Sequence, residues 1–297
     1  MALAIVQLIV MQIVLPAVFI AGLWRKPFQS RLEWLAETLF TCLFISWLFV
    51  GSPWDWFSYY LRYFWLILLA AAVYLSWKKG KGVPFRTAYN RGQKFTFGIY
   101  AVLLAVFGMY NVWAFSGYIT DDSPVELAFP LKDGTYHVVH GGSAVQINYH
   151  NEYLPQQYAL DIVKLTGWGG RAGGIYPKEL DSYAIYGEAL YSPCTGKVVE
   201  ARHDMPDLIP PETDSKHPEG NYVNIHCEGV NVLIAHMKEG SSTLAVGDPV
   251  EKGQKIGLVG NSGNTSEPHL HIHAEKDGEG IPIEFNGRFL VRNSLVK

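Results

Sequence analysis

The chain has 297 residues, 49% of them hydrophobic, and a formal net charge of −3. Residues 1–120 carry ten Lys and Arg, three acidic residues and no histidine, a net charge of +7, whereas residues 121–297 carry fourteen Lys and Arg, twenty-four acidic residues and all ten histidines, a net charge of −10. The acidic second part lacks the basic surface by which proteins bind nucleic acids, and two parts of such different composition predict two domains.

The first part is predicted to be a transmembrane anchor in a lipid bilayer. Four apolar segments, at about 2–23, 38–54, 57–77 and 95–116, have or approach the length of about 20 residues that crosses the hydrocarbon core. The first segment lacks the early positive charges and the small-residue cleavage site of a signal peptide, so we expect it to be retained. Several of the segments carry Trp or Tyr near their ends, as membrane spans commonly do.

The loops between these segments predict the orientation. Basic residues concentrate at 25–31 and 78–94, whereas the loop between the second and third segments carries only Asp55. Basic loops stay on the cytoplasmic side, which places both termini and the histidine-rich part outside, and a re-entrant hairpin of the middle two segments would leave this unchanged. Arg62 is the one charge within these four segments, so we interpret the bundle as an anchor rather than an ion pathway.

The second part consists of short β-like runs separated by glycines, a spacing typical of an all-β sandwich or barrel. Two irregular stretches interrupt it: Gly167 to Leu180, rich in glycine, and Asp204 to Gly220, rich in proline and acidic residues. Loops of this kind often line a substrate cleft, and an ordinary surface excursion is an equally good interpretation.

Three cysteines divide between the parts. Cys42 lies in the second apolar segment and is expected to be a small packing residue. Cys194 and Cys227 flank strand-like runs that could be antiparallel neighbours in an oxidising compartment, so a disulfide between them is a hypothesis. Two lone cysteines so far apart make a poor zinc motif.

The stretch GNSGNTSEPHLHIHAE, Gly260 to Glu275, alternates histidines with apolar residues. This period of two predicts a strand that turns Leu270 and Ile272 to a core and the histidines to the other face. Residues two apart lie about 7 Å apart along a strand, so His269 with His271, or His271 with His273, could bind one zinc. The spacing does not choose between the pairs, and a run of exposed histidines at a sheet edge is the alternative.

Further ligands must come from separate strands, because the helical HExxH motif is absent. His150 ends a strand-like run, Asp161 lies in the alternating YALDIV, and His236 follows the apolar VLIA. Imidazoles combined with a carboxylate are a ligand set that suits zinc.

The stretch from Gly260 resembles the signature of the LytM/lysostaphin-type zinc peptidases, family M23, which cleave peptides of the bacterial cell wall. VLIAHMKEGSSTLAVGDPVEKGQKIGLVGNSG is similar to the preceding block of that family, and the resemblance covers roughly residues 135–280. The membrane part takes no part in it.

The resemblance implies roles for six histidine and aspartate residues. It makes His150, Asp161 and His271 the ligands of one Zn²⁺, makes His236 and His269 the catalytic residues that handle protons and the oxyanion, and leaves His273 near the ligands or at the surface. The spacing between His150 and Asp161 departs from the family pattern, because the aspartate usually follows the histidine by four residues, whereas here it follows by eleven. The inserted NEYLPQQ must therefore loop out, or His140 or His137 supplies the first ligand instead.

Together these inferences predict an N-terminal membrane region of about four helices followed, over 121–297, by a mostly antiparallel β domain of the LytM/lysostaphin type. The resemblance implies a zinc endopeptidase that hydrolyses peptidoglycan stem or cross-bridge peptides. We expect it to be integral to the bacterial cytoplasmic membrane, multi-pass, with its N-terminus and C-terminal domain both extracytoplasmic. A catalytically silent module that binds the wall and regulates another hydrolase, or a membrane sensor, are the alternatives.

Overall fold

The computed structural model describes residues 2–297, and the chain forms two compact units. The first contains the chain up to Ser52 together with Tyr60–Phe115. The second contains Ser116–Lys297 and also the short segment Pro53–Tyr59, which we call the 53–59 loop.

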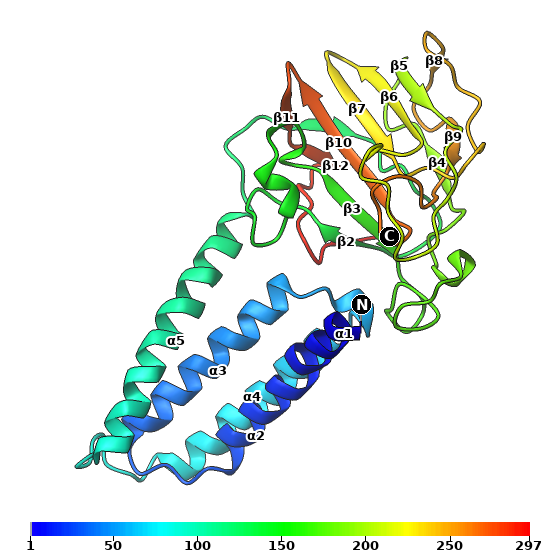
Figure 1. Ribbon diagram of the computed structural model, residues 1–297. Coiled ribbons are helices and arrows are strands. Elements are labelled where there is room, and N and C mark those ends of the chain that lie inside the picture. Colours follow the sequence, from blue (N-terminus) through cyan, green and yellow to red (C-terminus); the bar gives the residue numbers. More distant parts are fainter. Residues whose placement is uncertain (1) are drawn as a thin grey trace. The chain divides into compact units, whose positions relative to one another are not determined.

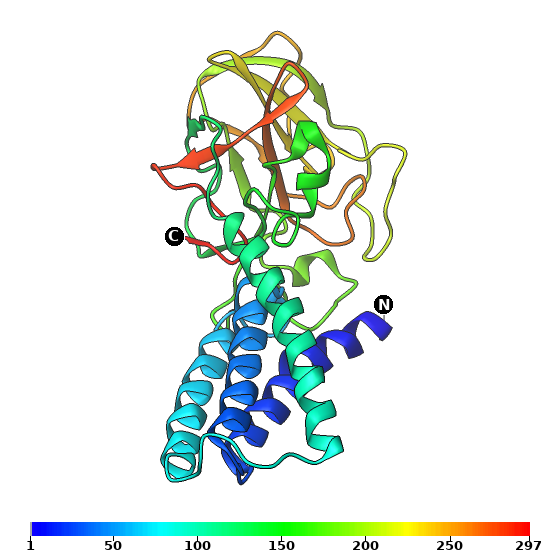
Figure 2. The ribbon, with the colours of Figure 1, turned by 90° about the vertical axis from the view of Figure 1, so that its left-hand side faces the viewer.

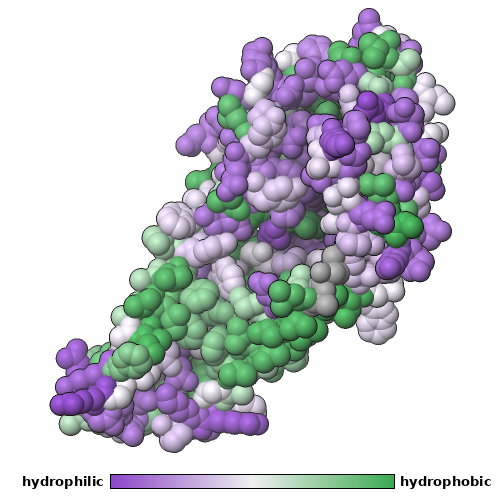
Figure 3. All heavy atoms as spheres, in the orientation of Figure 1, coloured by the Kyte–Doolittle hydropathy of each residue, from purple (hydrophilic) through white to green (hydrophobic). Residues whose placement is uncertain are grey.

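The first unit is helical (Figure 1). It contains α1 (Ala2–Ile9), a π-helical turn η1 (Val10–Val14), α2 (Leu15–Arg25), α3 (Arg31–Gly51), α4 (Leu61–Gly80) and α5 (Arg91–Ser116), whose last residue belongs to the second unit. Within residues 2–297, four helices are long and apolar enough to cross a membrane, with α1, η1 and α2 forming the first of them. Hydrophobic side chains cover most of the face of these helices that Figure 3 shows, as in a protein surrounded by lipid.

Helix α3 begins at Arg31, seven residues before the predicted span 38–54. The Ser30 hydroxyl accepts a hydrogen bond from the Glu33 backbone N–H at 3.2 Å, and the Glu33 carboxylate accepts one from the Gln29 backbone N–H at 3.0 Å. These contacts cap the helix N-terminus. The earlier start brings Glu37 into the helix, where the Lys26 ammonium lies 2.7 Å from its carboxylate.

Helices α3 and α4 are separated by more residues than predicted. The predicted spans 38–54 and 57–77 assigned Trp54 and Phe57 to the membrane, but α3 ends at Gly51, Trp54–Trp56 form a 3₁₀ turn (η2), and α4 starts at Leu61. Pro53 contributes to this ending because it has no backbone N–H to continue a helix.

The second unit is a β domain. Its strands are β1 (Val125–Leu127), β2 (Tyr136–His140), β3 (Leu160–Lys164), β4 (Ala189–Tyr191), β5 (Gly196–Arg202), β6 (Tyr222–Cys227), β7 (Val230–Ala235), β8 (Pro249–Val250), β9 (Lys255–Leu258), β10 (Leu270–Lys276), β11 (Glu279–Ile281), β12 (Ile283–Phe285) and β13 (Leu295–Val296). Single 3₁₀ turns lie at η3 (Tyr149–Glu152), η4 (Leu154–Gln156) and η5 (Leu180–Ser182).

Nine of these strands form one twisted sheet, which Figures 1 and 2 show from two sides. Its order is β13-β2-β3-β10-β7-β6-β5-β8, with β11 paired to the end of β10, and every pair is antiparallel. Two small sheets, β4 with β9 (antiparallel) and β1 with β12 (parallel), complete the unit. The predicted mostly antiparallel β domain is confirmed.

The core lies against one face of this sheet. Leu270 and Ile272 on β10 and Ile162 on β3 are completely buried within it. The side chains of β10 therefore point as predicted, with Leu270 and Ile272 toward the core and His271 and His273 toward the opposite face. That face is also covered, since these histidines are only 4% and 5% exposed, so the alternative of exposed histidines at a sheet edge is wrong.

Candidate metal centre and catalytic groove

Three adjacent strands bring the predicted residues together. Strand β10 lies between β3 and β7, and His271 is the cross-strand partner of Asp161 on one side and of Ala235 on the other. Directly opposed residues of an antiparallel pair project to the same face. His236 follows Ala235 directly after β7 with a φ of 58°, which ends the alternation of the strand, and its ring centre lies 5.7 Å from that of His271.

The 3₁₀ turn η3 brings His150 to these strands. The Asn148 side chain caps η3 and donates to the carbonyls of Gly142 and Ala159, at 3.0 and 3.1 Å. Turns η3 and η4 take up the residues between His150 and Asp161. The long spacing that departs from the family pattern is thus compatible with both side chains meeting at one point.

His150, Asp161 and His271 form a group that could hold a metal ion. Asp161 Oδ2 lies 2.9 Å from His150 Nε2, Asp161 Oδ1 lies 2.9 Å from His271 Nδ1, and all three donor atoms lie within 4.8 Å of one another. Ligand atoms of a tetrahedral zinc with bonds of about 2 Å are roughly 3.3 Å apart, so only small movements separate this arrangement from zinc coordination. Two imidazoles and one carboxylate also match the donor types that zinc prefers.

His236 and His269 lie beside this group, and in each ring Nδ1 faces a backbone carbonyl. His236 Nδ1 lies 2.9 Å from the Ser262 carbonyl, and His269 Nδ1 lies 2.9 Å from the Glu267 carbonyl. A carbonyl only accepts, so each Nδ1 carries a hydrogen and each Nε2 is left for chemistry. The ring centres are 4.8 Å apart, and His269 Nε2 is 3.5 Å from Asp161 Oδ1.

His273 lies next to His271, on the side of the His271 ring that faces away from Asp161. Its Nδ1 lies 3.0 Å from His271 Nε2, the nitrogen that does not face Asp161. His273 is thus placed to accept a hydrogen bond from a His271 ring that binds metal through Nδ1, an arrangement that fixes the orientation and tautomer of metal-bound histidines.

Burial and neighbouring charges set the pKa values of the group. Burial raises the pKa of Asp161, but His150 and His269 outweigh it and hold that pKa well below its usual range. Burial lowers the pKa of His269, but the Asp161 carboxylate outweighs it and raises the value. Burial, followed by the neighbouring His269, holds the pKa of His236 well below its usual value. The two histidines beside the metal group therefore differ in basicity.

The alternative first ligands contact other side chains, although His140 is itself the cross-strand partner of Asp161. His137 Nε2 contacts Asn293 Oδ1 at 2.9 Å, and His140 Nδ1 accepts from Arg292 Nη2 at 3.0 Å. Burial and the Arg292 guanidinium lower the pKa of His140 to about 2. A nitrogen occupied by a guanidinium donor is a poor metal ligand, and His150 is the better partner for Asp161 and His271.

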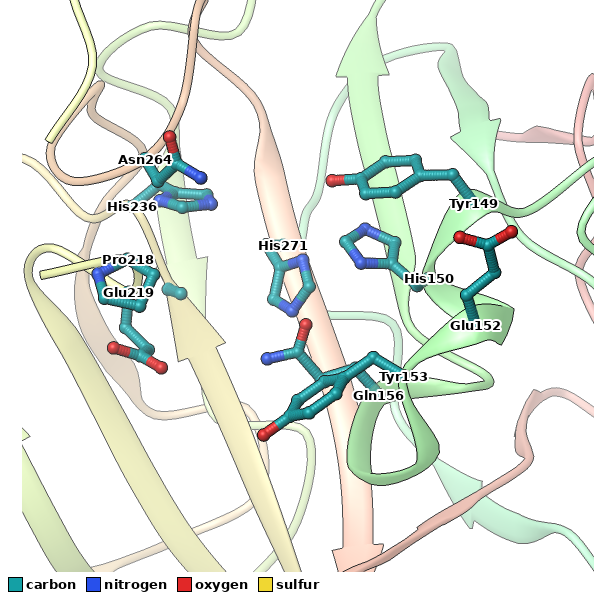
Figure 4. A pocket seen from close by; sticks show the side chains of 11 residues that line it. Tyr149, His150, Glu152, Tyr153, Gln156, Pro218, Glu219, His236, Asn264 and His271 are labelled. Carbon is teal, nitrogen blue, oxygen red and sulfur yellow. The ribbon is translucent and has the colours of Figure 1, made fainter. Parts of the chain in front are cut away.

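A groove opens directly onto the metal group. It is a cavity of about 330 Å³, and Figure 4 shows His271 and His150 at its centre, with Tyr149 on one side, His236 and Asn264 on the other, and Tyr153 below. Its lining also includes Glu152, Gln156, Pro218, Glu219 and Ala235. Pro218 and Glu219 come from the proline-rich loop, for which a cleft wall and a surface excursion were equally good interpretations. Tyr149, Tyr153 and Asn264 were not predicted, although Tyr149 directly precedes a candidate ligand.

Two further sequence hypotheses concern the cysteines. The structure joins Cys194 and Cys227 by a disulfide with a Cα separation of 6.0 Å, and the strands they flank, β5 and β6, pair antiparallel. Cys42 is a free cysteine in α3.

Comparison with known proteins finds a family match for one part of the chain. The sequence profile of peptidase family M23 matches residues 178–283, so the chain contains an M23 peptidase domain with the M23 fold. The match includes His236, His269 and His271 and begins after His150 and Asp161, whose assignment therefore depends on geometry.

Solved structures similar to this chain include three proteins with weak overall superposition. A zinc-containing peptidase from Vibrio cholerae is 19% identical over 54% of this chain and 39% of its own, with a TM-score of 0.34. Pseudoalterin, an M23 metalloprotease from the deep sea, is 16% identical over 59% and 99%, with a TM-score of 0.36. A chain of the SpoIIQ–SpoIIIAH pore-forming complex is 17% identical over 54% and 89%, with a TM-score of 0.34. This chain thus spans about two fifths of the Vibrio protein.

Proposed function

We propose that the protein is a membrane-anchored zinc endopeptidase that hydrolyses peptide bonds in peptidoglycan stem or cross-bridge peptides. The observation that carries the proposal is the convergence of three zinc-type donor atoms with two further imidazoles at the floor of an open groove. The M23 family match supports the peptidase activity, and the four apolar helices support the anchor.

In this proposal His150, Asp161 and His271 hold the zinc. Zinc bound there supplies Lewis-acid polarisation of a peptide carbonyl and a lower pKa for a water molecule. Of His236 and His269, one accepts the proton of the attacking water at Nε2, and the other donates a hydrogen bond to the developing oxyanion and a proton to the leaving amine. The C–N bond breaks, and a new carboxylate and a new amine are formed.

The residues that line the groove favour a peptide as the substrate. Tyr149 and Tyr153 offer aromatic surface with hydroxyl groups beside the metal group, and Glu152 and Glu219 offer carboxylates. Such a mixed lining suits an extended peptide that carries amide and amine groups. The basic loops at 25–31 and 78–94 support an extracytoplasmic location of this groove, where the cell wall lies.

The proposal is tested by digestion of purified peptidoglycan with the full chain in lipid nanodiscs. New peptide ends, identified by mass spectrometry, should appear with zinc and be absent with a chelator. The matched control is His269→Ala, which should retain zinc and release few fragments. A zinc-loaded wild-type protein that binds peptidoglycan without releasing fragments would favour the silent wall-binding module instead.

A further inference from the structure

The 53–59 loop, although it lies between two apolar helices in the chain, is built into the β domain. Trp54 and Asp55 are each 1% exposed. The Tyr59 backbone N–H donates to the Gly169 carbonyl at 2.8 Å, and the Arg171 backbone N–H donates to the Asp55 carbonyl at 3.0 Å. The loop therefore forms one folded structure with the glycine-rich segment 167–180.

Arg171 connects this loop to the segment that precedes β10. Its guanidinium, 1% exposed, lies 3.6 Å from the Asp55 carboxylate, and both Nε and Nη2 lie 2.7 Å from Oε2 of Glu267. The same guanidinium lies 4.0 Å from the ring centre of Trp56. A buried cation thus lies between one carboxylate of the loop and one carboxylate two residues before His269.

A second connection runs in parallel. Trp56 stacks on Tyr176, with ring centres 5.5 Å apart and an interplanar angle of 17°, and the Tyr176 hydroxyl donates to the Ser266 carbonyl at 2.8 Å. The 53–59 loop therefore holds both Ser266 and Glu267 through segment 167–180.

These contacts end at a catalytic histidine. The Glu267 backbone carbonyl accepts from His269 Nδ1 at 2.9 Å and from the Thr265 hydroxyl at 2.7 Å. The position of this carbonyl fixes which way the His269 ring points and which nitrogen it presents to Asp161. Moving Glu267 would therefore move the reactive Nε2.

We propose that Asp55, Arg171 and Glu267 are positioning residues for His269, so that the loop between α3 and α4 is part of the active-site support. Arg171 anchors the Glu267 side chain, Asp55 and Trp56 anchor Arg171, and the Glu267 carbonyl orients the His269 ring. None of these three side chains has to touch substrate. The effect on turnover rests on the proposed peptidase function, whereas the effect on the conformation of residues 265–269 does not.

The test uses the full chain in nanodiscs and four variants. Asp55→Asn and Arg171→Met remove the anchor. The combined variant Asp55→Asn/Arg171→Met/Glu267→Gln removes all three charges together, which avoids leaving an unpaired buried charge if Arg171→Met alone fails to fold. Lys164→Met is the matched control, because it breaks an ion pair of the same 2.7 Å length, with Glu188, elsewhere in the β domain.

Three quantities are measured: zinc per protein, deuterium uptake of peptides covering 262–269, and kcat and KM on soluble muropeptides released from peptidoglycan by a glycosidase. We expect normal zinc content in all variants, faster exchange at 262–269 in the three loop-network variants, and kcat lowered roughly tenfold to a hundredfold with little change in KM. Lys164→Met should match the wild type in all three.

Unchanged exchange at 262–269 in the charge-free combined variant would overturn the proposal, and so would a wild-type kcat in that variant. If the wild type itself cleaves nothing, the exchange data still decide the positioning role, and only the peptidase function fails. Faster exchange at 262–269 in an inactive wild-type background would support the positioning role alone.

Discussion

His273 provides a sharp test of the candidate metal group, because it contacts the proposed ligand His271 and is not itself one of the three proposed ligands. Replacing His273 by Ala removes the acceptor that lies 3.0 Å from His271 Nε2. Losing such a partner costs a metal site roughly 10- to 100-fold in affinity, which is about 1.4 to 2.7 kcal/mol. We expect a decrease of that size in zinc affinity, because the His271 ring loses its fixed orientation.

Competition titration of the full chain against a zinc-binding dye measures this affinity. His273→Asn should retain most of it, since the amide oxygen of asparagine can occupy the position of Nδ1 and accept the same hydrogen bond. His226→Ala is the matched control, because His226 is an exposed histidine on β6 that contacts Asn231. Zinc affinity of His273→Ala within twofold of the wild type would refute the reasoning.

Further substitutions test the remaining assignments. His271→Ala should abolish stoichiometric zinc by elemental analysis, whereas His269→Ala should keep the metal and lose most turnover; preserved turnover would exclude His269 as a catalytic residue. The pKa of His140, about 2 in the folded protein, lies below the ordinary 6.5, so the unfolded state takes up a proton that the folded state does not, and stability should fall as pH decreases below about 6.5. Between pH 7 and 5 this amounts to about 2 kcal/mol, and thermal unfolding of His140→Gln should lack that part of the dependence. The double variant Cys194→Ser/Cys227→Ser removes the disulfide, which joins two residues at a sequence separation of 33, and should lower the free energy of unfolding by about 3 to 4 kcal/mol. Denaturant titration measures this change, and an unchanged midpoint would contradict the prediction.

Much of the β domain could be predicted from local patterns. The alternation through Leu270, His271, Ile272 and His273 predicted the strand and its two faces, because a period of two is a local property of the sequence. The pairing of β10 with β3 could not be derived in this way. It depends on which strands meet in the sheet, and the family resemblance, rather than the spacing, suggested Asp161.

The proposed first ligand, His150, shows a second limit. Two 3₁₀ turns, η3 and η4, lie in the stretch that separates His150 from Asp161, and the Asn148 side chain that caps η3 also bonds to Gly142 and Ala159. Such contacts join residues across a fold that a linear sequence does not display. The sequence therefore left both His150 and His140 as candidates for the first ligand, and the contact of Arg292 with His140 in the structure favours His150.

The 53–59 loop shows a third limit. Its aromatic residues have the composition of a membrane segment, and Trp54 and Phe57 were accordingly assigned to spans. The partners of the neighbouring Trp56, which are Arg171 and Tyr176, lie more than a hundred residues later in a glycine-rich stretch with no periodic pattern. Hydropathy measures how apolar a segment is, and it does not distinguish burial in lipid from burial in a protein core.

The most direct test of the central claim is a peptidoglycan digest in H₂¹⁸O by the full chain, with zinc-loaded, chelator-treated and His269→Ala samples in parallel. Hydrolysis places one ¹⁸O atom in the carboxyl group of each new peptide end. The account predicts labelled ends from the zinc-loaded wild type and few or none from the other two samples. Labelled ends of equal abundance in all three samples, or no labelled ends from a zinc-loaded, folded wild type, would contradict it.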